Sequence, residues 1–436
     1  MKSKRRSPSE SQPSKLRRRT AVAATLLFAA YALLVFIVAP KRVPHAIQSH
    51  SPLRVVQWSE AARQKIATRI AVLFRPSLLG AHRWSLVVMD ERGRVLFADA
   101  PSRAVAPASA QKIIVAETAL RVLGPSFRFP TLLVARSPVG ASKHIATLWV
   151  VGSGDPSLRA RDLRDSARAL RRIGVRSIGR IAVDPTASRS AELNPHWNPR
   201  NDGAPYQAPT SAISVDGNLF DSTPVVHPNR VAGEILRKAL QHVGIRVRSA
   251  VVISPAPLLG SVLWEHYSAP LTTLERHMLV QSDNHYAEQL LQAVALRSDE
   301  RADNAAGFRA ERAMLRTLHV PTPGLHLLDG SGLSHGNRIA AITLATLLLR
   351  TRGRGAYDME PLLARAGLDG TLQGIDFGAA SGRVRAKTGH LDDASSLEGF
   401  VRTRHHGEVI FAFEVNGSPG DPDAAMRRAV AALSLM

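Results

Sequence analysis

Three short motifs that lie far apart along the chain constrain its fold more than any other feature of the sequence. They are S-x-x-K at Ser109–Lys112, S-x-N at Ser282–Asn284 and K-T-G at Lys387–Gly389. Beyond residue 50 the chain has only five lysines and otherwise uses arginine, yet two of those five lie in these motifs. A desolvated lysine can lose its proton, whereas arginine stays protonated under ordinary conditions. We therefore predict that the fold gathers these motifs around a site that needs an amine.

Each motif taken alone also has a simple structural explanation. A serine at a helix start is most often an N-cap, S-D-N is a typical capping triplet, and K-T-G suits the end of a strand. In the catalytic interpretation Ser109 is the nucleophile and Lys112, on the same helix face, is its base. Ser282 would relay the proton to a leaving amine, and Asn284 would hold the peptide group of the substrate. The occurrence of all three motifs in this order favours catalysis.

The third motif is typical of a site that recognises a carboxylate. Lys387 and Thr388 would bind that carboxylate by charge and hydroxyl, and Gly389 would let the substrate backbone approach closely. An oxyanion hole would come from backbone N–H groups, one at the nucleophilic serine and one at His390. A second cation near Lys112 would lower its pKa, and we expect Lys387 to be that cation.

The composition excludes several classes of protein. With 436 residues, 45% of them hydrophobic, the chain can bury a large core in one elaborated domain or in two. It has no cysteine, which rules out disulfides, thiol catalysis and Cys-based zinc sites. None of its sixteen histidines lies in a metal-ligand spacing such as H-E-x-x-H, and His405–His406 falls in a predicted turn. We predict no metal site.

The strong positive charge is spread along the chain. The formal net charge is +22, of which residues 1–20 carry +7 through eight Lys or Arg and one Glu. A dispersed basic surface suits polyanionic surroundings such as nucleic acid, anionic lipid or an acidic wall polymer. Because no nucleic-acid motif accompanies the charge, we predict no nucleic-acid partner.

An uncharged run at 21–39 follows this basic tail. As a helix it would span about 28 Å, close to the thickness of a hydrocarbon core, and the preceding basic residues place the N-terminus inside. We predict a cytoplasmic tail (1–20), a single-pass signal anchor (21–39) and a linker (40–56). A signal peptide cleaved near Ala30–Ala32 is the alternative.

Secondary structure follows from the periodicity of the remaining chain. Residues 127–267 differ from their surroundings by short strands and helices with frequent Pro and Gly, so this segment reads as an insertion. Within it, two similar patterns predict helices that are capped by Gly174 and Gly244 and return to strands. Outside it we predict helices at 62–73, 113–122, 271–296, 340–349 and 423–435, and hairpins at 84–98 and 397–415.

Together with the motifs, several longer stretches resemble the class C low-molecular-mass penicillin-binding proteins, the D-alanyl-D-alanine carboxypeptidase/endopeptidase family. The resemblance runs from about Trp84 to Gly417. The stretches that carry it are Pro107–Lys112, Gly152–Leu158, Tyr206–Ile213, Ser282–Glu288, Asp329–Ser334 and Gly370–Leu372.

The resemblance implies an α+β fold: a β-lactamase/transpeptidase-like domain, an antiparallel sheet flanked by helices, formed by 57–126 and 268–436 and split by an inserted α/β subdomain at 127–267. It also implies cleavage of the D-Ala-D-Ala end or the cross-link of peptidoglycan stem peptides through an acyl-enzyme. β-lactam antibiotics would acylate the same serine, and no cofactor is implied. The sequence departs from the family pattern at His335, where arginine is common, and at Asp216, where asparagine is usual. These departures affect the expected substrate preference.

Two other functions stay open at this point. A β-lactamase-type hydrolase would share the three motifs, and a non-catalytic envelope module could keep the fold without turnover. The retained lysines count against the second. We expect the protein in the bacterial inner membrane with its catalytic part in the periplasm, or free in the periplasm if the signal is cleaved. Carboxypeptidase against endopeptidase preference and the oligomeric state are left open.

Overall fold

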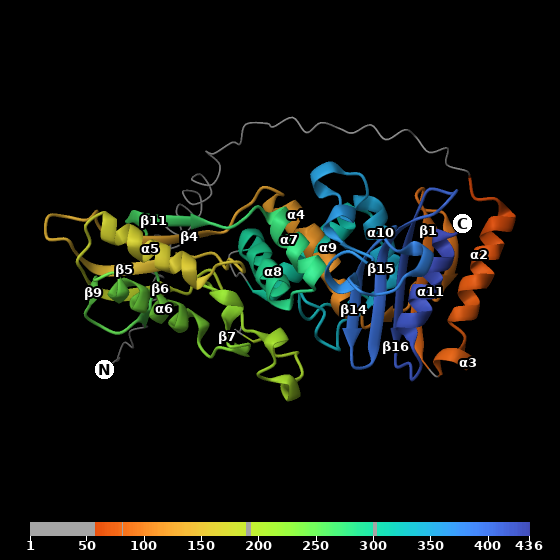
Figure 1. The fold of residues 1–436 in the computed structure, drawn as a ribbon, viewed down its shortest axis with the longest axis horizontal. Helices are drawn as coiled ribbons and strands as arrows, with labels where there is room; N and C mark the ends of the chain where they lie inside the picture. Colours follow the sequence, from red (N-terminus) through yellow and green to blue (C-terminus); the bar gives the residue numbers. More distant parts are fainter. Residues whose placement is uncertain (1–56, 81, 189–192, 300–302) are drawn as a thin grey trace, which may run out of the picture. The chain divides into compact units, whose positions relative to one another are not determined.

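One antiparallel sheet joins segments from both ends of the described chain in this computed structural model (Figure 1). The structure describes residues 57–80, 82–188, 193–299 and 303–436, so the predicted tail, anchor and linker lie outside the described residues. The strands of this sheet, in spatial order, are β13 (Ala364–Arg365), β14 (Val384–Leu391), β15 (Ala394–Arg402), β16 (Glu408–Asn416), β1 (Arg83–Asp90) and β2 (Val95–Asp99).

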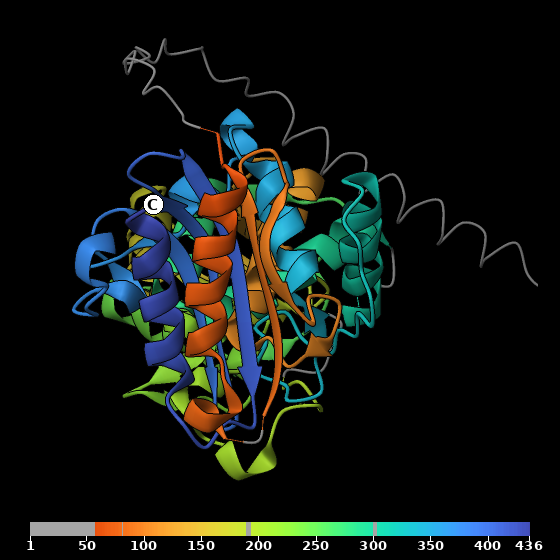
Figure 2. The same cartoon turned by 90° about the vertical axis from the view of Figure 1, so that its right-hand side faces the viewer.

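Helices cover both faces of this sheet (Figures 1 and 2). On one face lie α2 (Glu60–Leu73), α3 (Pro76–Leu79) and α11 (Pro422–Ser434). On the other lie α4 (Gln111–Leu123), α7 (Leu271–Gln281), α8 (Asn284–Ser298), α9 (Asn304–Thr317) and α10 (Ala341–Thr351). Figure 2 shows α2 and α11 side by side in front of the sheet, and these two helices are in contact.

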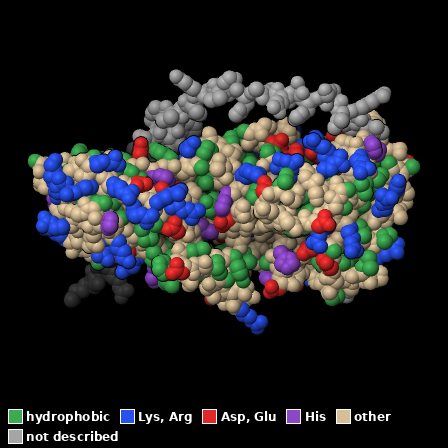
Figure 3. All heavy atoms as spheres, in the orientation of Figure 1, with side chains coloured by type: hydrophobic (Ala, Val, Ile, Leu, Met, Phe, Trp, Pro, Cys, Tyr) green, Lys and Arg blue, Asp and Glu red, His purple; other side chains and the backbone are tan. Residues whose placement is uncertain are grey.

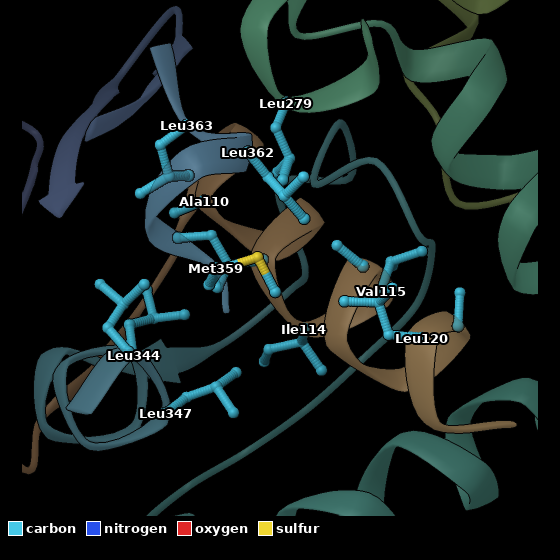
Figure 4. Close-up of a cluster of buried hydrophobic side chains, with 14 of the residues drawn as sticks. Ala110, Ile114, Val115, Leu120, Leu279, Leu344, Leu347, Met359, Leu362 and Leu363 are labelled. Carbon is cyan, nitrogen blue, oxygen red and sulfur yellow. The ribbon is translucent and has the colours of Figure 1, made fainter. Parts of the chain in front are cut away.

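The two faces have separate apolar cores because side chains alternate along each strand. On β16, Phe411 and Phe413 pack toward α2 and α11, whereas Ile410 and Ala412 pack toward the helices of the opposite face. Figure 4 shows part of this second core, where side chains from α4, α7 and α10 meet around Met359. The start of α4 is therefore anchored from several sides.

A second, mixed sheet is built from residues 130–267. Its strands are β4 (Pro130–Ala135), β5 (His144–Gly152), β6 (Ser177–Asp184), β9 (Arg246–Val247), β10 (Val252–Ile253) and β11 (Ser261–Tyr267). β6 pairs in parallel with β5, β9 and β10, while β4 pairs antiparallel with β5 and β11. The helices α5 (Ala160–Arg172) and α6 (Pro228–His242) share a core with this sheet. Two short pairs complete the strands: β3 (Ala104–Val105) with β12 (Ile339–Ala340), and β7 (Leu219–Phe220) with β8 (Thr223–Pro224).

Most predicted elements are present, and one is wrong. Both hairpins, the helices near 62–73 and 423–435, and the glycine returns at Gly174 and Gly244, with φ of +95° and +77°, occur as predicted. The helix predicted over 271–296 is instead two helices, because Ser282 adopts left-handed backbone angles (φ +59°) and ends α7. The described residues from 57 onward form one compact unit, so the domain boundaries at 126/127 and 267/268 stay predictions.

The surface agrees with a dispersed positive charge. Lys and Arg side chains lie across the whole face shown in Figure 3, with acidic side chains between them. No helix within the described ranges is both long enough and apolar enough to cross a bilayer.

Two of the longer stretches quoted above pack directly on each other. Gly152 at the end of β5 lies against Ala212 and Ile213, and Gly154 N–H donates to Ala212 O at 2.9 Å. A Cβ on Gly152 would come within 2.2 Å of Ile213 Cδ1 and 2.3 Å of Ala212 O. Glycine is therefore required here by close approach of backbone and side chain.

We predict that Gly152→Ala destabilises the protein by about 1–3 kcal/mol, because the added methyl group has no space. Gly140→Ala is the matched control: its Cβ would meet nothing within 4 Å, and it should change stability by less than about 1 kcal/mol. Urea unfolding of the full-length chain in detergent measures both. Equal midpoints for the two variants would contradict the packing described.

Candidate active site

The three motifs lie at the junction of the antiparallel sheet and the helices beside it. Ser109 belongs to a short 3₁₀ turn, Ala108–Ala110, that leads directly into α4. Ala108, the residue before Ser109, is fully buried and has a φ of +49°. This left-handed conformation is unfavourable for alanine and is typical of functional sites. Asn284 is the first residue of α8, and the K-T-G motif lies within β14.

Lys112 is fully buried and connects the first two motifs. Its Nζ lies 2.9 Å from Ser109 Oγ, 2.7 Å from Asn284 Oδ1 and 2.6 Å from Ser331 O. A neutral amine has two N–H groups and one lone pair. The amide and carbonyl oxygens can accept from the two N–H groups, which leaves the lone pair for the Ser109 hydroxyl. The geometry therefore suits an amine that removes the proton from Ser109.

Lys387, also fully buried, connects the second and third motifs. Its Nζ donates to Ser282 Oγ at 2.9 Å and to Thr388 O at 2.6 Å. The left-handed turn at Ser282 directs the hydroxyl toward this amine, while the side chain of Asp283 caps α8 by accepting from Tyr286 N–H at 3.1 Å. The capping explanation of S-D-N thus applies to the aspartate.

Burial dominates the electrostatics of both amines. It lowers the pKa of Lys112 to about 8, against the opposing effect of the nearby carboxyl groups of Asp329, Glu288 and Asp283. The expected effect of Lys387 on the pKa of Lys112 stays a prediction, although the two amines do interact, and the charge of each disfavours the charge of the other. Burial also lowers the pKa of Lys387, and the charge of Lys112 lowers it further.

Gly389 brings β14 against the nucleophile. A Cβ at this position would lie 2.3 Å from Ser396 Oγ, 2.7 Å from Pro107 O and 2.9 Å from Ser109 N. Packing within the protein therefore already requires glycine here, and its role in the approach of the substrate backbone stays a prediction. Ser396 Oγ donates to Pro107 O at 2.8 Å and fixes this contact. The backbone N–H groups at Ser109 and His390 stay predicted oxyanion donors.

A buried loop at residues 329–334 contacts Lys112 through the carbonyl group of Ser331. Glu288 on α8 accepts from the N–H groups of Gly330 and Ser331 at 2.9 and 2.7 Å, which holds the Ser331 carbonyl against the amine. Burial raises the pKa of Glu288 to about 8. The fully buried carboxylate of Asp329 accepts from Gly332 N–H at 2.8 Å and Ser334 N–H at 2.6 Å.

The segment predicted to be inserted also contributes to this region. Tyr206 O accepts from Asn284 Nδ2 at 3.0 Å, which fixes the orientation of the Asn284 amide with Oδ1 toward Lys112. Trp197 Nε1 donates to Asp329 Oδ2 at 3.0 Å. Sequence reasoning quoted several of these stretches but gave Ser331, Glu288 and Tyr206 no role, because their contacts join distant parts of the chain.

The two departures from the family pattern have local explanations. His335 is exposed, and its Nδ1 lies 3.0 Å from Asp393 Oδ1. Asp216 has φ +52°, a conformation that Asn and Asp tolerate best, and its carboxylate accepts from Ala160 N–H at 3.3 Å at the start of α5. Within the described part of the chain, no cluster of three or more His, Asp or Glu side chains could hold a metal ion.

Comparison with known proteins extends over most of the chain. Residues 64–226 and 222–435 match the D-Ala-D-Ala carboxypeptidase 3 (S13) family. The chain is 29% identical to a D-alanyl-D-alanine carboxypeptidase from Actinomadura sp. (strain R39), over 83% of this chain and 82% of that protein. It is 30% identical to the carboxypeptidase DacB of Mycolicibacterium smegmatis, over 82% and 81% of the two chains.

The fold is shared with penicillin binding protein 4 from Haemophilus influenzae. The TM-score is 0.76 at 22% identity, and the match covers 83% of this chain and 97% of that one. A second structure of the same protein holds a β-lactam.

We predict that acylation of Ser109 by benzylpenicillin accelerates as the pH rises through about 8, the value to which burial lowers the pKa of Lys112. Only the unprotonated amine can accept the serine proton, so below this pH the rate constant should fall roughly tenfold per pH unit. Gel labelling with a fluorescent penicillin measures the rate. Lys112→Arg should show no labelling at any pH, since arginine cannot act as the base. A rate that does not change with pH would argue against Lys112 as the base.

Proposed function

Because the chain belongs to the D-Ala-D-Ala carboxypeptidase 3 (S13) family, we propose that it is a penicillin-binding serine peptidase that cleaves peptidoglycan stem peptides at D-alanine, either at a D-Ala-D-Ala end or at a cross-link. The observation that carries this proposal is the hydrogen-bonded series from Ser109 through Lys112 to Asn284, with Lys387 and Ser282 beside it. It supplies a nucleophile, a base, an amide and a cation.

The proposed acylation step begins with the nucleophile and its base. Lys112 takes the proton from Ser109, and Oγ attacks the carbonyl carbon of the penultimate D-alanine. The oxyanion accepts hydrogen bonds from backbone N–H groups at Ser109 and His390. The C–N bond then breaks, the leaving amine receives the proton through Ser282, and the acyl group stays on Oγ. Water later hydrolyses this ester and restores the free serine.

The K-T-G strand binds the carboxylate of the departing residue in this proposal. Lys387 provides positive charge, and the hydroxyl of Thr388 lies 2.8 Å from that of Thr371, which orients it at the sheet edge. A β-lactam with a carboxylate beside its ring would use the same groups and acylate Ser109.

The decisive experiment exposes the full-length chain to benzylpenicillin and maps the adduct by peptide mass spectrometry. We expect a stable adduct on Ser109 and none on Ser109→Ala. A separate incubation of protein not exposed to penicillin with purified peptidoglycan fragments distinguishes release of a terminal D-alanine from cleavage of a cross-link.

Two other outcomes would replace the proposal. Fast loss of the adduct with turnover of penicillin would identify a β-lactamase-type hydrolase. A folded protein without any adduct would identify a non-catalytic envelope module. Unfolded protein is recognised beforehand by the loss of its thermal transition.

We further propose that residues 21–39 anchor the protein in the bacterial inner membrane, with the catalytic part in the periplasm. The support is the uncharged run after a basic tail.

Membrane fractionation after expression in a bacterial host tests this proposal. We expect the intact chain in the membrane fraction and resistant to an alkaline wash. The double variant Leu27→Arg/Leu34→Arg should lose this behaviour, because charges in the centre of a bilayer are strongly unfavourable. A soluble periplasmic protein that begins after Ala32 would show instead that the signal is cleaved.

A further inference from the structure

Two glutamates are buried on the active-site face of the antiparallel sheet. On β15, Glu398 lies directly opposite Lys387 of β14. On β16, Glu414 lies opposite Ser396, one row further along the same face. Both side chains are fully buried. The acylation steps proposed above assign neither of them a role.

Cross-strand neighbours on one face are close enough to interact strongly. Cβ atoms of directly opposed residues in antiparallel strands are about 4.5–5.5 Å apart. Side chains alternate along a strand, and Phe400 and Ala412 show that Glu398 and Glu414 share the face that packs on the catalytic helices. Lys387 therefore has the carboxyl group of Glu398 as its cross-strand neighbour on this face.

The carboxyl group of Glu398 has little other compensation. Burial raises the pKa of this carboxyl group well above its usual value, and the charge of Lys387 is the largest effect that opposes the rise, ahead of the Ser396 hydroxyl and the Leu397 N–H. However, within the described residues no hydrogen bond of normal geometry reaches either of its oxygens, and the Ser396 hydroxyl donates to Pro107 O. A buried carboxylate without hydrogen bonds persists only beside a positive charge.

The proposed role of Lys387 requires a positive charge that burial disfavours. Binding of a substrate carboxylate by charge requires an ammonium ion, but burial and the neighbouring Lys112 both favour the neutral amine. Glu398 is the group that opposes them and raises the pKa of Lys387. Each of the two side chains therefore favours the charged form of the other.

We infer that Glu398 is a positioning residue that supplies the negative charge needed to keep Lys387 as an ammonium ion, ready to bind the carboxylate of the substrate. This inference rests on the proposed function. Glu414 remains protonated beside it, because burial and the charge of Glu398 both raise its pKa. The two neighbouring rows then contain one cation, one anion and one neutral acid, an arrangement with no net buried charge.

Other charged side chains around β14 interact with groups other than Lys387. Arg385, on the same strand, lies 3.8 Å from Glu360. The carboxyl groups of Asp329, Glu288 and Asp283 act on Lys112. Of the groups that act on Lys387, Lys112 is therefore the competing cation and Glu398 the compensating anion.

The test compares two substrates that differ only in the charge that Lys387 would recognise. They are the thioester N-benzoyl-D-alanyl-thioglycolate and its methyl ester, with kcat/KM measured from thiol release by the full-length chain in detergent. For Glu398→Gln we expect kcat/KM for the free acid to fall about tenfold or more, because Lys387 would lose the charge with which it binds the substrate carboxylate. The value for the ester should change less than about threefold. The preference for the acid should also disappear at a lower pH than in the parent protein.

Glu275→Gln is the matched control. Glu275 on α7 is also fully buried, and neither of its carboxylate oxygens has a hydrogen-bond partner in the described structure. Glu117 is the neighbouring charge that acts on it. Its removal should leave the ratio between the two substrates unchanged. Glu398→Asp keeps the charge and should retain the preference for the acid, and it serves as the test if Glu398→Gln does not fold.

Three results would overturn the inference. They are an equal loss for acid and ester in Glu398→Gln, no loss for either, or loss of the preference in a folded Glu398→Asp. These outcomes differ from a failure of the proposed function, in which the parent protein itself would neither turn over the thioesters nor form an adduct on Ser109.

Discussion

Removal of two lysine amines from water is the constraint on which the site depends. Lys112 and Lys387 are both fully buried, and an ammonium ion without its hydration shell is unstable unless it is compensated or loses its proton. The structure around Lys112 favours the neutral amine. At Lys387, we infer that Glu398 compensates the charge of the ammonium ion. The oxygens of Asn284 and Ser331 accept from Lys112, and Glu398 lies opposite Lys387. Arginine could not be adjusted in this way.

Much of the fold and the meeting of the motifs could be predicted from the sequence, because they depend on local signals. Alternation of apolar residues predicts the hairpins, and a glycine after an amphipathic run predicts where α5 and α6 end. The S-x-x-K spacing already places Lys112 beside Ser109, since both lie on one helical turn. The order of the motifs along the chain then indicated that Asn284 and Lys387 join them.

What sequence could not provide depends on contacts between distant segments. The third partner of Lys112 is a backbone carbonyl at Ser331, and no side-chain pattern marks a carbonyl. The pairing of Glu398 with Lys387 depends on strand register. A shift of the register by one residue would change every cross-strand contact. The extent to which Lys112 is buried could not be predicted either, because burial follows from packing between distant segments.

Helix α8 serves two parts of the molecule at once. Its first residue, Asn284, contacts Lys112, while its later residues His285, Gln289 and Gln292 bond to Ser214, Ser211 and Thr210 of the segment 127–267. Excision of that segment would leave these buried polar groups without partners and would release the Asn284 amide from Tyr206. The segment 127–267 therefore cannot be removed without compensating changes in α8. A trimmed enzyme would need new hydrophobic residues along α8 and a new acceptor for Asn284 before it could fold and act.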